Sequence, residues 1–327
     1  MKKTGKLLMA AVVALGALSG CTSAQGDDIK KVSVVQIVSH PSLDTIRDSF
    51  SDEMEQLGYT EGEIELEYYD AGNDTSTLDS ILSTASGDGS DVIVAIATPT
   101  AQSAARYAEE IPIVFAAVSD PIGAGLTSSL EEPDKNITGT MDDIQVDQIL
   151  EAALEIDPDM QRLGVIYNAS EANSVTNIEK AKTFCEENGI ELQEVTVTST
   201  NDVQQAVTTL AGSCDAIFSP NDNTVASAMS AAAQAALEAG IPYYVGADSM
   251  VSDGGFLTVG IDYEELGRET ARMVDQVLQG TDVTDIPIVQ FKTDLSIYVN
   301  ASTMEAFGRT LPALIADSER LVMMEQE

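Results

Sequence analysis

The chain has 327 residues and is strongly acidic, with 54 Asp and Glu against 16 Lys and Arg and a formal net charge of −38. A charge of this sign argues against binding to nucleic acid and against close contact with anionic lipid. The length suffices for two domains of ordinary size. Because the acids are dispersed along the chain, we expect a solvated acidic surface rather than an acidic tail.

The first residues have the pattern of a secretion signal. Three lysines precede an apolar stretch over 7–17, which is too short to span a bilayer as a stable helix, and small residues then run into Cys21 in a pattern that resembles a bacterial lipobox. We expect 1–20 to be a lipoprotein signal peptide and 21–30 to be a lipidated Cys21 with a polar tether. The alternative is ordinary secretory cleavage near an incidental cysteine. The predicted location is the cell surface or the periplasm, and no later stretch is long and apolar enough to cross a membrane.

Short strands alternate with helices through the first half of the chain, and the pattern resets near 136–140. This alternation predicts βαβ units and a parallel sheet. We expect strands over 32–38, 64–69, 91–97 and 113–118, and helices over 43–57, 76–85 and 100–108.

The second half repeats the order of the first. Residues 90–108 (SDVIVAIATPTAQSAARYA) and 214–232 (CDAIFSPNDNTVASAMSAA) both contain an Asp, a buried strand, a polar turn and an Ala/Ser-rich helix, and Ile-Pro and a further strand follow each. We therefore predict two similar α/β lobes with a ligand between them. The expected elements are strands over 163–167, 191–197, 215–219, 243–246 and 257–261, and helices over 144–155, 224–239 and 264–279.

The order of these elements also predicts how the lobes are connected. After the second copy we expect the chain to return to the first lobe and then to finish the second. The predicted N-terminal lobe is 31–142 plus 258–287, and the predicted C-terminal lobe is 143–257 plus 288–327. Several such crossovers form a multi-segment hinge.

Polar turns follow the expected strands, and ligands of parallel α/β sheets bind beyond the carboxyl ends of the strands. Most of these turns open a helix, whose free N–H groups suit a carboxylate. The candidate ligand-binding residues are Ser39, His40, Ala97, Thr98, Ser119 and Asp120 in the first lobe, and Asn168, Ser170, Glu171, Asn173, Asn221, Asp222, Asn223 and Asp248 in the second.

Several classes of site are not expected. His40 is the only histidine and no Cys/His spacing suits zinc, so we expect no metal and no cofactor. The chain has no Gly-x-Ser-x-Gly elbow and neither a P-loop nor a dinucleotide fingerprint, which argues against an enzyme. Cys185 and Cys214 are expected to be buried and unpaired, with a disulfide as the alternative outside the cytoplasm.

Seven segments resemble one family of ABC transporter substrate-binding lipoproteins, whose members include tryptophan- and tyrosine-binding proteins. They are SHPSLD, VAIATPTAQSAA, IPIVFAAVSDPIGAGL, NITGT, LGVIYNASEANS, NDNTVASA and GIDYEELGRETARMVDQVLQG. The resemblance implies two Rossmann-like lobes, in a fold of the periplasmic binding protein type I kind, that close on a small molecule and deliver it to permease subunits. We expect a monomer that reaches the membrane only through its lipid anchor.

An amino acid with an aromatic side chain is the predicted ligand: tryptophan, tyrosine or phenylalanine. Hydroxyls of Thr98, Ser119 or Ser170 are expected at its carboxylate. Asp222, which stands where the first copy has Thr98, is expected at its ammonium. Candidate walls for the side chain are Tyr167, Met250, Phe256 and Tyr263, and Asn177 is expected on an outer helix face.

Three alternatives stay open from the sequence. Asp222 and its neighbouring asparagines could serve only as helix caps, and Ser119 and Asp120 could serve only as a turn. The ligand could be a branched aliphatic amino acid. The same cleft could also belong to a lipoprotein that senses a ligand and signals, rather than one that delivers it for transport.

Overall fold

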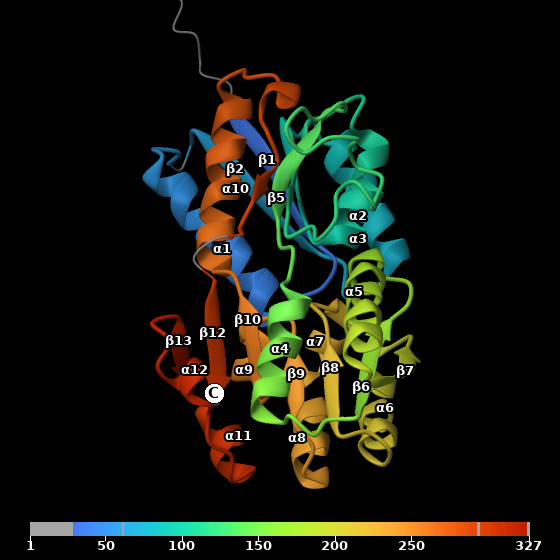
Figure 1. The fold of residues 1–327 in the computed structure, drawn as a ribbon. Coiled ribbons are helices and arrows are strands. Elements are labelled where there is room, and N and C mark those ends of the chain that lie inside the picture. The colour runs from blue at the N-terminus through green and yellow to red at the C-terminus, as the bar shows by residue number, and fades with distance from the viewer. Residues whose placement is uncertain (1–28, 61, 293–294, 326–327) are drawn as a thin grey trace, which may run out of the picture.

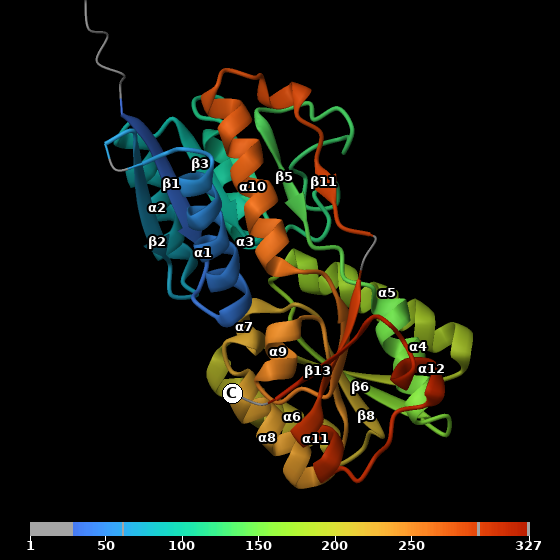
Figure 2. The ribbon, with the colours of Figure 1, turned by 90° about the vertical axis from the view of Figure 1, so that its left-hand side faces the viewer.

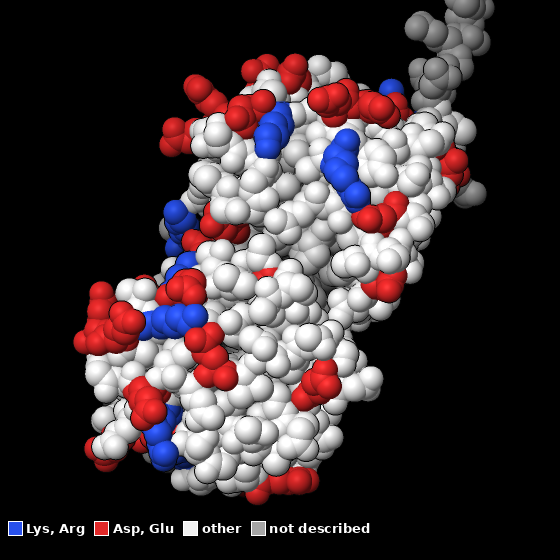
Figure 3. All heavy atoms as spheres, turned by 90° about the vertical axis from the view of Figure 1, so that its right-hand side faces the viewer, with Lys and Arg blue, Asp and Glu red and all other residues white. Residues whose placement is uncertain are grey.

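The computed structural model describes residues 29–60, 62–292 and 295–325, which form two α/β lobes, each built around one sheet (Figure 1). Residues 1–28 lie outside the described residues. They comprise the expected signal peptide, Cys21 and most of the expected tether. Within the described ranges, no helix is long and apolar enough to cross a membrane. On the face drawn in Figure 3, acidic side chains are scattered over both lobes.

The N-terminal lobe contains a six-stranded sheet in the order β11-β5-β4-β3-β1-β2, with every neighbouring pair parallel. Its middle strands lie between helices on both faces, which is why they read as nearly continuous apolar runs. Val34 of β1, for example, lies opposite Tyr68 on one side and Val94 on the other. The strands are β1 (Lys30–Gln36), β2 (Ile64–Asp70), β3 (Val92–Ile96), β4 (Ile113–Ala116), β5 (Ile137–Met141) and β11 (Val289–Gln290).

Helices α1 and α10 cover one face of this sheet, and α2 and α3 cover the other (Figure 2). Gly267 allows α10 to pack closely on α1, because a Cβ at this position would lie 2.5 Å from the carbonyl oxygen of Ile46. The helices are α1 (Pro41–Gln56), α2 (Thr75–Gly87), α3 (Thr98–Ala104), α10 (Tyr263–Leu278) and the 3-10 turns η1 (Ala105–Tyr107) and η2 (Val283–Asp285).

The C-terminal lobe contains a seven-stranded sheet in the order β13-β12-β10-β9-β8-β6-β7. Its strands are parallel except where β12 meets β10, which is an antiparallel pair. The strands are β6 (Arg162–Asn168), β7 (Glu191–Val197), β8 (Ala216–Ser219), β9 (Tyr243–Val245), β10 (Leu257–Gly260), β12 (Ser296–Asn300) and β13 (Leu321–Met324).

The helices of this lobe differ from expectation in two ways: the helices over 172–188, 200–211, 248–252, 301–306 and 313–316 are not among those expected, and the single helix expected over 224–239 is divided into α7 and α8. The second of these begins after Ala228, whose backbone is not helical. The helices are α4 (Val146–Ile156), α5 (Ala172–Asn188), α6 (Thr200–Ala211), α7 (Asn223–Ala226), α8 (Met229–Ala239), α9 (Asp248–Ser252), α11 (Ala301–Ala306) and α12 (Ala313–Ala316).

The chain crosses between the lobes three times, after β5, after β10 and after β11, which gives the expected multi-segment hinge. The expected boundaries are wrong by a few residues at two of these crossings. Residues 258–260 belong to the C-terminal sheet, because β10 pairs with β9 and β12. Residues 289–290 belong to the N-terminal sheet, because β11 pairs with β5.

Candidate functional site

The turns at the carboxyl ends of the strands in both sheets meet between the lobes and enclose a cavity. Six of the residues predicted from the sequence line it: His40, Ala97, Thr98, Asn173, Asn221 and Asn223. The other lining residues are Ser42, Leu43, Ala117, Asp142, Ala226, Ala247, Met250 and Tyr263. The lining mixes small apolar side chains with a few polar ones, which is typical of a small-molecule site.

The two lobes are closed against each other around this cavity. The lining leaves about 350 Å³ of space, but a water-sized sphere fits in only about 20 Å³ of it. His40 Nε2 lies 3.2 Å from Asn223 Oδ1 across the lobe interface, and the Ser42 and Ser249 hydroxyls bond each other. A molecule larger than a water therefore requires the lobes to separate.

Asp142 is the only acidic residue that lines the cavity in the described chain, and it lies at the end of β5, where the first crossing begins. The Ser119 hydroxyl donates to its Oδ1 at 2.9 Å, and the Asn221 amide donates to its Oδ2 at 2.7 Å from the other lobe. The Tyr263 hydroxyl lies 3.5 Å from Oδ2. All these partners are neutral, and burial raises the pKa of Asp142 to about 6.

Three polar atoms of the lining have no hydrogen-bond partner among the described residues: His40 Nδ1, Thr98 Oγ1 and Asn173 Oδ1. Buried polar atoms in native proteins are nearly always paired. They are therefore available to a ligand, and they come from both lobes.

The chemical character of two of these atoms follows from their neighbours. The Asn223 amide nitrogen donates to Glu171, so its Oδ1 faces His40 and the Nε2 of His40 carries the donated proton. Burial lowers the pKa of His40, which keeps the ring neutral and leaves Nδ1 as an acceptor. The Asn173 amide nitrogen donates to the carbonyl of Asn221 at 3.0 Å, so its free Oδ1 is also an acceptor.

The backbone is strained at two alanines of the lining. Ala97 has φ 75° and ψ 155°, a region that is essentially restricted to glycine, and Ala117 has φ 56°. They follow the adjacent strands β3 and β4. Strain of this kind costs on the order of 1–3 kcal/mol and is concentrated at active sites and ligand clamps.

Asp222 does not line the cavity, and its carboxylate is fully buried within the C-terminal lobe. It accepts hydrogen bonds from the backbone N–H of Asn168 and Val225 and from the hydroxyl of Ser174, at 2.7 to 2.8 Å. Asp222 is thus the N-cap of α7. Burial raises its pKa, and burial together with the charge of Asp222 raises the pKa of Glu171.

Glu171 also points into the C-terminal lobe rather than into the cavity. Its carboxylate accepts from the backbone N–H groups of Asn223 and Thr224 at 3.0 and 3.1 Å. It therefore holds the turn that carries Asn223, without lining the cavity itself.

The remaining predicted site residues surround the cavity or lie away from it. Ser119 supports Asp142, and Asn168 binds Ser170 and Thr224 within the C-terminal lobe. Ser39 donates to Asp44, Asp120 accepts from Gly123 in a turn, and Asp248 accepts from Ser249. Of the four expected wall residues, Met250 and Tyr263 line the cavity, whereas Phe256 packs at a tilt against Tyr244 in the core and Tyr167 donates to Glu194.

The expectation that Asn177 lies on an outer helix face is wrong. Its side chain is fully buried, donates to Asn221 Oδ1 at 3.1 Å and accepts from Lys180. Asn177 therefore orients Asn221, which reaches Asp142 across the lobes. Cys185 and Cys214 are both buried and unpaired.

Sequence reasoning missed Asp142 because it missed the strand before it. β5 has the sequence ITGTM, in which Gly139 and two threonines weaken the apolar signal. The signal that could have found Asp142 is the rule that located the other turns, a polar residue directly after a strand.

Comparison with known proteins gives a consistent family assignment. The sequence model of a family described as ABC transporter substrate binding protein matches residues 31–320. A relative named tyrosine-binding protein, from Clostridioides difficile (strain R20291), is 33% identical over 338 residues, which cover 99% of this chain and 97% of the relative.

Two solved structures of similar sequence differ in how well they superpose. An ABC domain from Streptococcus pneumonia in complex with L-Trp is 32% identical, has a TM-score of 0.86, and matches 90% of this chain and 100% of that one. The ligand-free, open structure of a substrate-binding protein with adhesive properties from Clostridium difficile is 36% identical, covers 91% and 100%, and has a TM-score of 0.69. The lobes of this chain are thus arranged more like those of the L-Trp complex than those of the open protein.

Proposed function

The chain belongs to the ABC transporter substrate-binding proteins, which are binding proteins and not enzymes, and we propose that its ligand is an amino acid with an aromatic side chain. The observation that carries this proposal is Asp142, a buried carboxylate in the cavity lining with only neutral partners. A buried charge of this kind is stabilised when a cation pairs with it.

The polar lining suits the ammonium group of an amino acid. An ammonium has three N–H donors and no acceptor. Asp142 offers a charged acceptor, and His40 Nδ1 and Asn173 Oδ1 offer two neutral ones. The free hydroxyl of Thr98 can donate to the ligand carboxylate. The ammonium and the carboxylate of the ligand would then bind different residues of the lining.

The apolar lining suits the side chain of the ligand. Leu43 and Met250 are the large apolar residues of the lining, and Tyr263 adds a ring. A methionine sulfur makes favourable contacts with aromatic rings, and aromatic side chains gain most from burial against such walls. The relatives named for tyrosine and bound to L-Trp support the same class of ligand.

Capture would occur by closure of the lobes on the three-segment hinge. The lining groups come from both lobes, and Asn221 already contacts Asp142 across the lobe interface. A ligand that contacts both lobes binds the closed form more tightly than the open form, and therefore shifts the population toward the closed form. We propose that permease subunits of an importer recognise that form and receive the ligand.

We also propose that the chain works outside the cytoplasm, tethered through a lipidated Cys21. The basic start, the short apolar stretch and the small residues before the cysteine support this. Metabolic labelling with a radioactive fatty acid tests it: the wild type should be labelled and Cys21→Ser should not. Equal labelling of both, or of neither, would argue against the anchor.

Ligand class is tested by thermal unfolding of the chain from residue 22 onward, after unfolding and refolding to remove carried-over ligand. A ligand at about 1,000 times its Kd adds roughly 4 kcal/mol to the native state. Tyrosine, tryptophan or phenylalanine should raise Tm, and leucine should not. N-acetyl-tyrosine, which lacks the ammonium, is the matched control and should give no shift. The proposal fails if no amino acid stabilises the protein, or if N-acetyl-tyrosine acts as well as tyrosine.

A further inference from the structure

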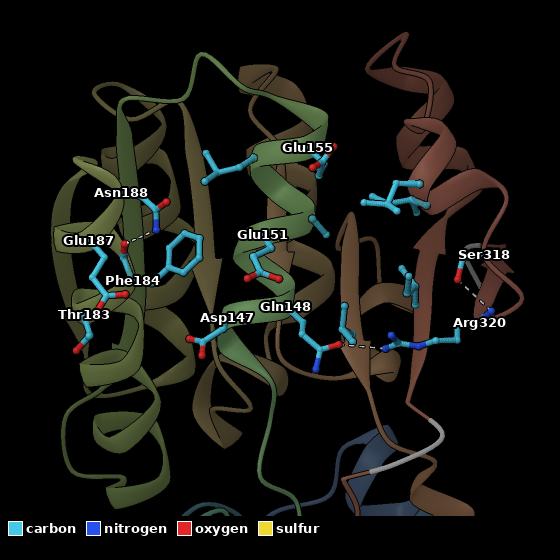
Figure 4. Close-up of a pocket in the computed structure, with 16 residues that line it drawn as sticks. Asp147, Gln148, Glu151, Glu155, Thr183, Phe184, Glu187, Asn188, Ser318 and Arg320 are labelled. Atoms are coloured by element: carbon cyan, nitrogen blue, oxygen red, sulfur yellow. Dashed lines mark hydrogen bonds between the residues drawn. The ribbon is translucent and has the colours of Figure 1, made fainter.

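The C-terminal lobe has a second hollow that is larger than the interlobe cavity and separate from it. A water-sized sphere can occupy about 830 Å³ of this groove, against about 20 Å³ of the interlobe cavity. The groove lies along α4, between α5 on one side and the C-terminal segment on the other (Figure 4). None of its lining residues lines the interlobe cavity. All of them belong to the C-terminal lobe, so the groove exists whether the lobes are open or closed.

Four carboxylates line the groove, and three of them form a stripe on one helix. Asp147, Glu151 and Glu155 are spaced by four residues on α4, and Glu187 faces them from α5 (Figure 4). Like charges at this spacing destabilise a helix. Within the described part of the chain, none of these four side chains makes a hydrogen bond or an ion pair.

The lysines of α5 and the arginine in the groove lining are engaged elsewhere. Lys180 and Lys182 of α5 bind carboxylates that do not line it. Arg320 does line the groove, but its guanidinium donates to Gln148 at 3.2 Å and to a backbone carbonyl (Figure 4). Among the residues that the structure describes, the acidic stripe on α4 therefore has no cationic partner.

The groove also presents an apolar side chain to solvent. Leu314 is 71% exposed, the largest exposed fraction of any large hydrophobic residue in the described ranges. Leu154 and Ile297, which are half-buried, add to this apolar lining, whereas Ile315 and Phe184 are buried. An apolar patch with a polar rim is typical of a surface that binds another molecule.

We propose that this groove docks a polypeptide segment of a partner protein in which Lys or Arg side chains flank an apolar side chain. The cations pair with the stripe on α4, and the apolar side chain packs on Leu314. A second copy of this chain is a poor occupant, because two chains of net charge −38 repel each other. A metal ion does not fit either, since the described residues include no cluster of three or more His, Cys, Asp or Glu side chains that could hold one.

A labelled peptide tests this proposal on the chain from residue 22 onward. A fluorescein-labelled amphipathic peptide of lysine and leucine should bind saturably, with an affinity that falls as salt rises. The same pattern made of glutamate and leucine should not bind. Glu151→Lys and Leu314→Ser should each weaken binding about tenfold or more, and both positions are on the surface, so folding can be checked separately by Tm.

Glu109→Lys is the matched control, because it makes the same charge change at an exposed acid of the N-terminal lobe. It should leave peptide binding unchanged. Equal losses in Glu109→Lys and Glu151→Lys would mean that only the overall charge attracts the peptide, and the proposal would be overturned. A benzophenone on the peptide should crosslink to 147–155 or 314–320. Crosslinks elsewhere, or the absence of saturable binding, would also overturn it.

Discussion

Replacing Asp142 with asparagine should affect ligand binding and the stability of the ligand-free protein in opposite directions. Asp142 is buried among neutral donors, and its pKa rises from 3.8 to about 6. Keeping this carboxylate ionised at neutral pH therefore costs the folded state on the order of 3 kcal/mol. Asparagine removes that cost, but it offers one acceptor oxygen where the carboxylate offers two to Ser119 and Asn221. We therefore expect a net gain in stability of about 1–2 kcal/mol.

The same substitution should weaken ligand binding. Removing one partner of a buried charge pair costs about 2–5 kcal/mol, which corresponds to roughly a 30-fold to 5,000-fold increase in Kd. Isothermal titration of the ligand-stripped protein with an aromatic amino acid measures this, and urea unfolding measures stability. Asp147→Asn is the matched control: Asp147 lies on α4, makes no hydrogen bond or ion pair among the described residues and does not line the interlobe cavity, so ligand affinity should hold.

The pH dependence follows from the same shift. Because the folded state binds the proton of Asp142 more tightly than the unfolded chain does, Asp142 lowers the stability of the ligand-free protein as pH rises from about 4 to 6. Ligand affinity should fall about tenfold per pH unit below about 6, as the carboxylate is neutralised. Burial also raises the pKa of Glu171 and Asp248, so the difference between wild type and Asp142→Asn isolates Asp142. Wild-type affinity in this variant, or a joint loss of affinity and stability, would refute the reasoning.

Three further substitutions test other parts of the site. Ala97→Gly removes the backbone strain of an alanine in a glycine-like conformation and should raise the free energy of unfolding, measured in urea, by up to about 2 kcal/mol. Ala101→Gly, inside α3, is the control and should lower it by about 1 kcal/mol; lower stability in both variants would contradict the strain. Thr98→Val removes a hydroxyl without a partner and should raise Kd about 2-fold to 10-fold, with Tm unchanged; unchanged Kd would remove Thr98 from the site. Asn177→Ala removes the support of Asn221 and should lower stability by about 1–3 kcal/mol and weaken ligand binding; wild-type values in both assays would contradict that role.

Local chemistry was enough to place several of the predicted residues next to the interlobe cavity. The sequence places His40, Thr98 and Asn223 in polar turns that follow strands, and the structure places all three in the cavity lining. Parallel strands bring their carboxyl ends to one edge of a sheet. For that reason, identifying a strand and the turn after it already gives the approximate position of the turn residues.

The choice between Asp222 and Asp142 could not be made in this way. An Asp before a short helix fits both a cap and a ligand contact, and the direction of the Asp222 side chain is set by Asn168 and Ser174, about fifty residues earlier in the chain. Asp142 follows a strand with a weak local signal. Gly139 of that strand is required by its neighbour β4, because a Cβ there would lie 2.0 Å from the carbonyl oxygen of Phe115.

The sequence by itself determined the two α/β lobes, the repeated strand order and the edge at which the site lies, because hydrophobic periodicity and turn chemistry act over a few residues. Only the tertiary structure decided which side chains of those turns face the cavity and which support it. It also decided that the acids on α4 share a groove with Leu314. Those outcomes depend on packing and hydrogen bonds between residues far apart in the chain, and no local pattern records them.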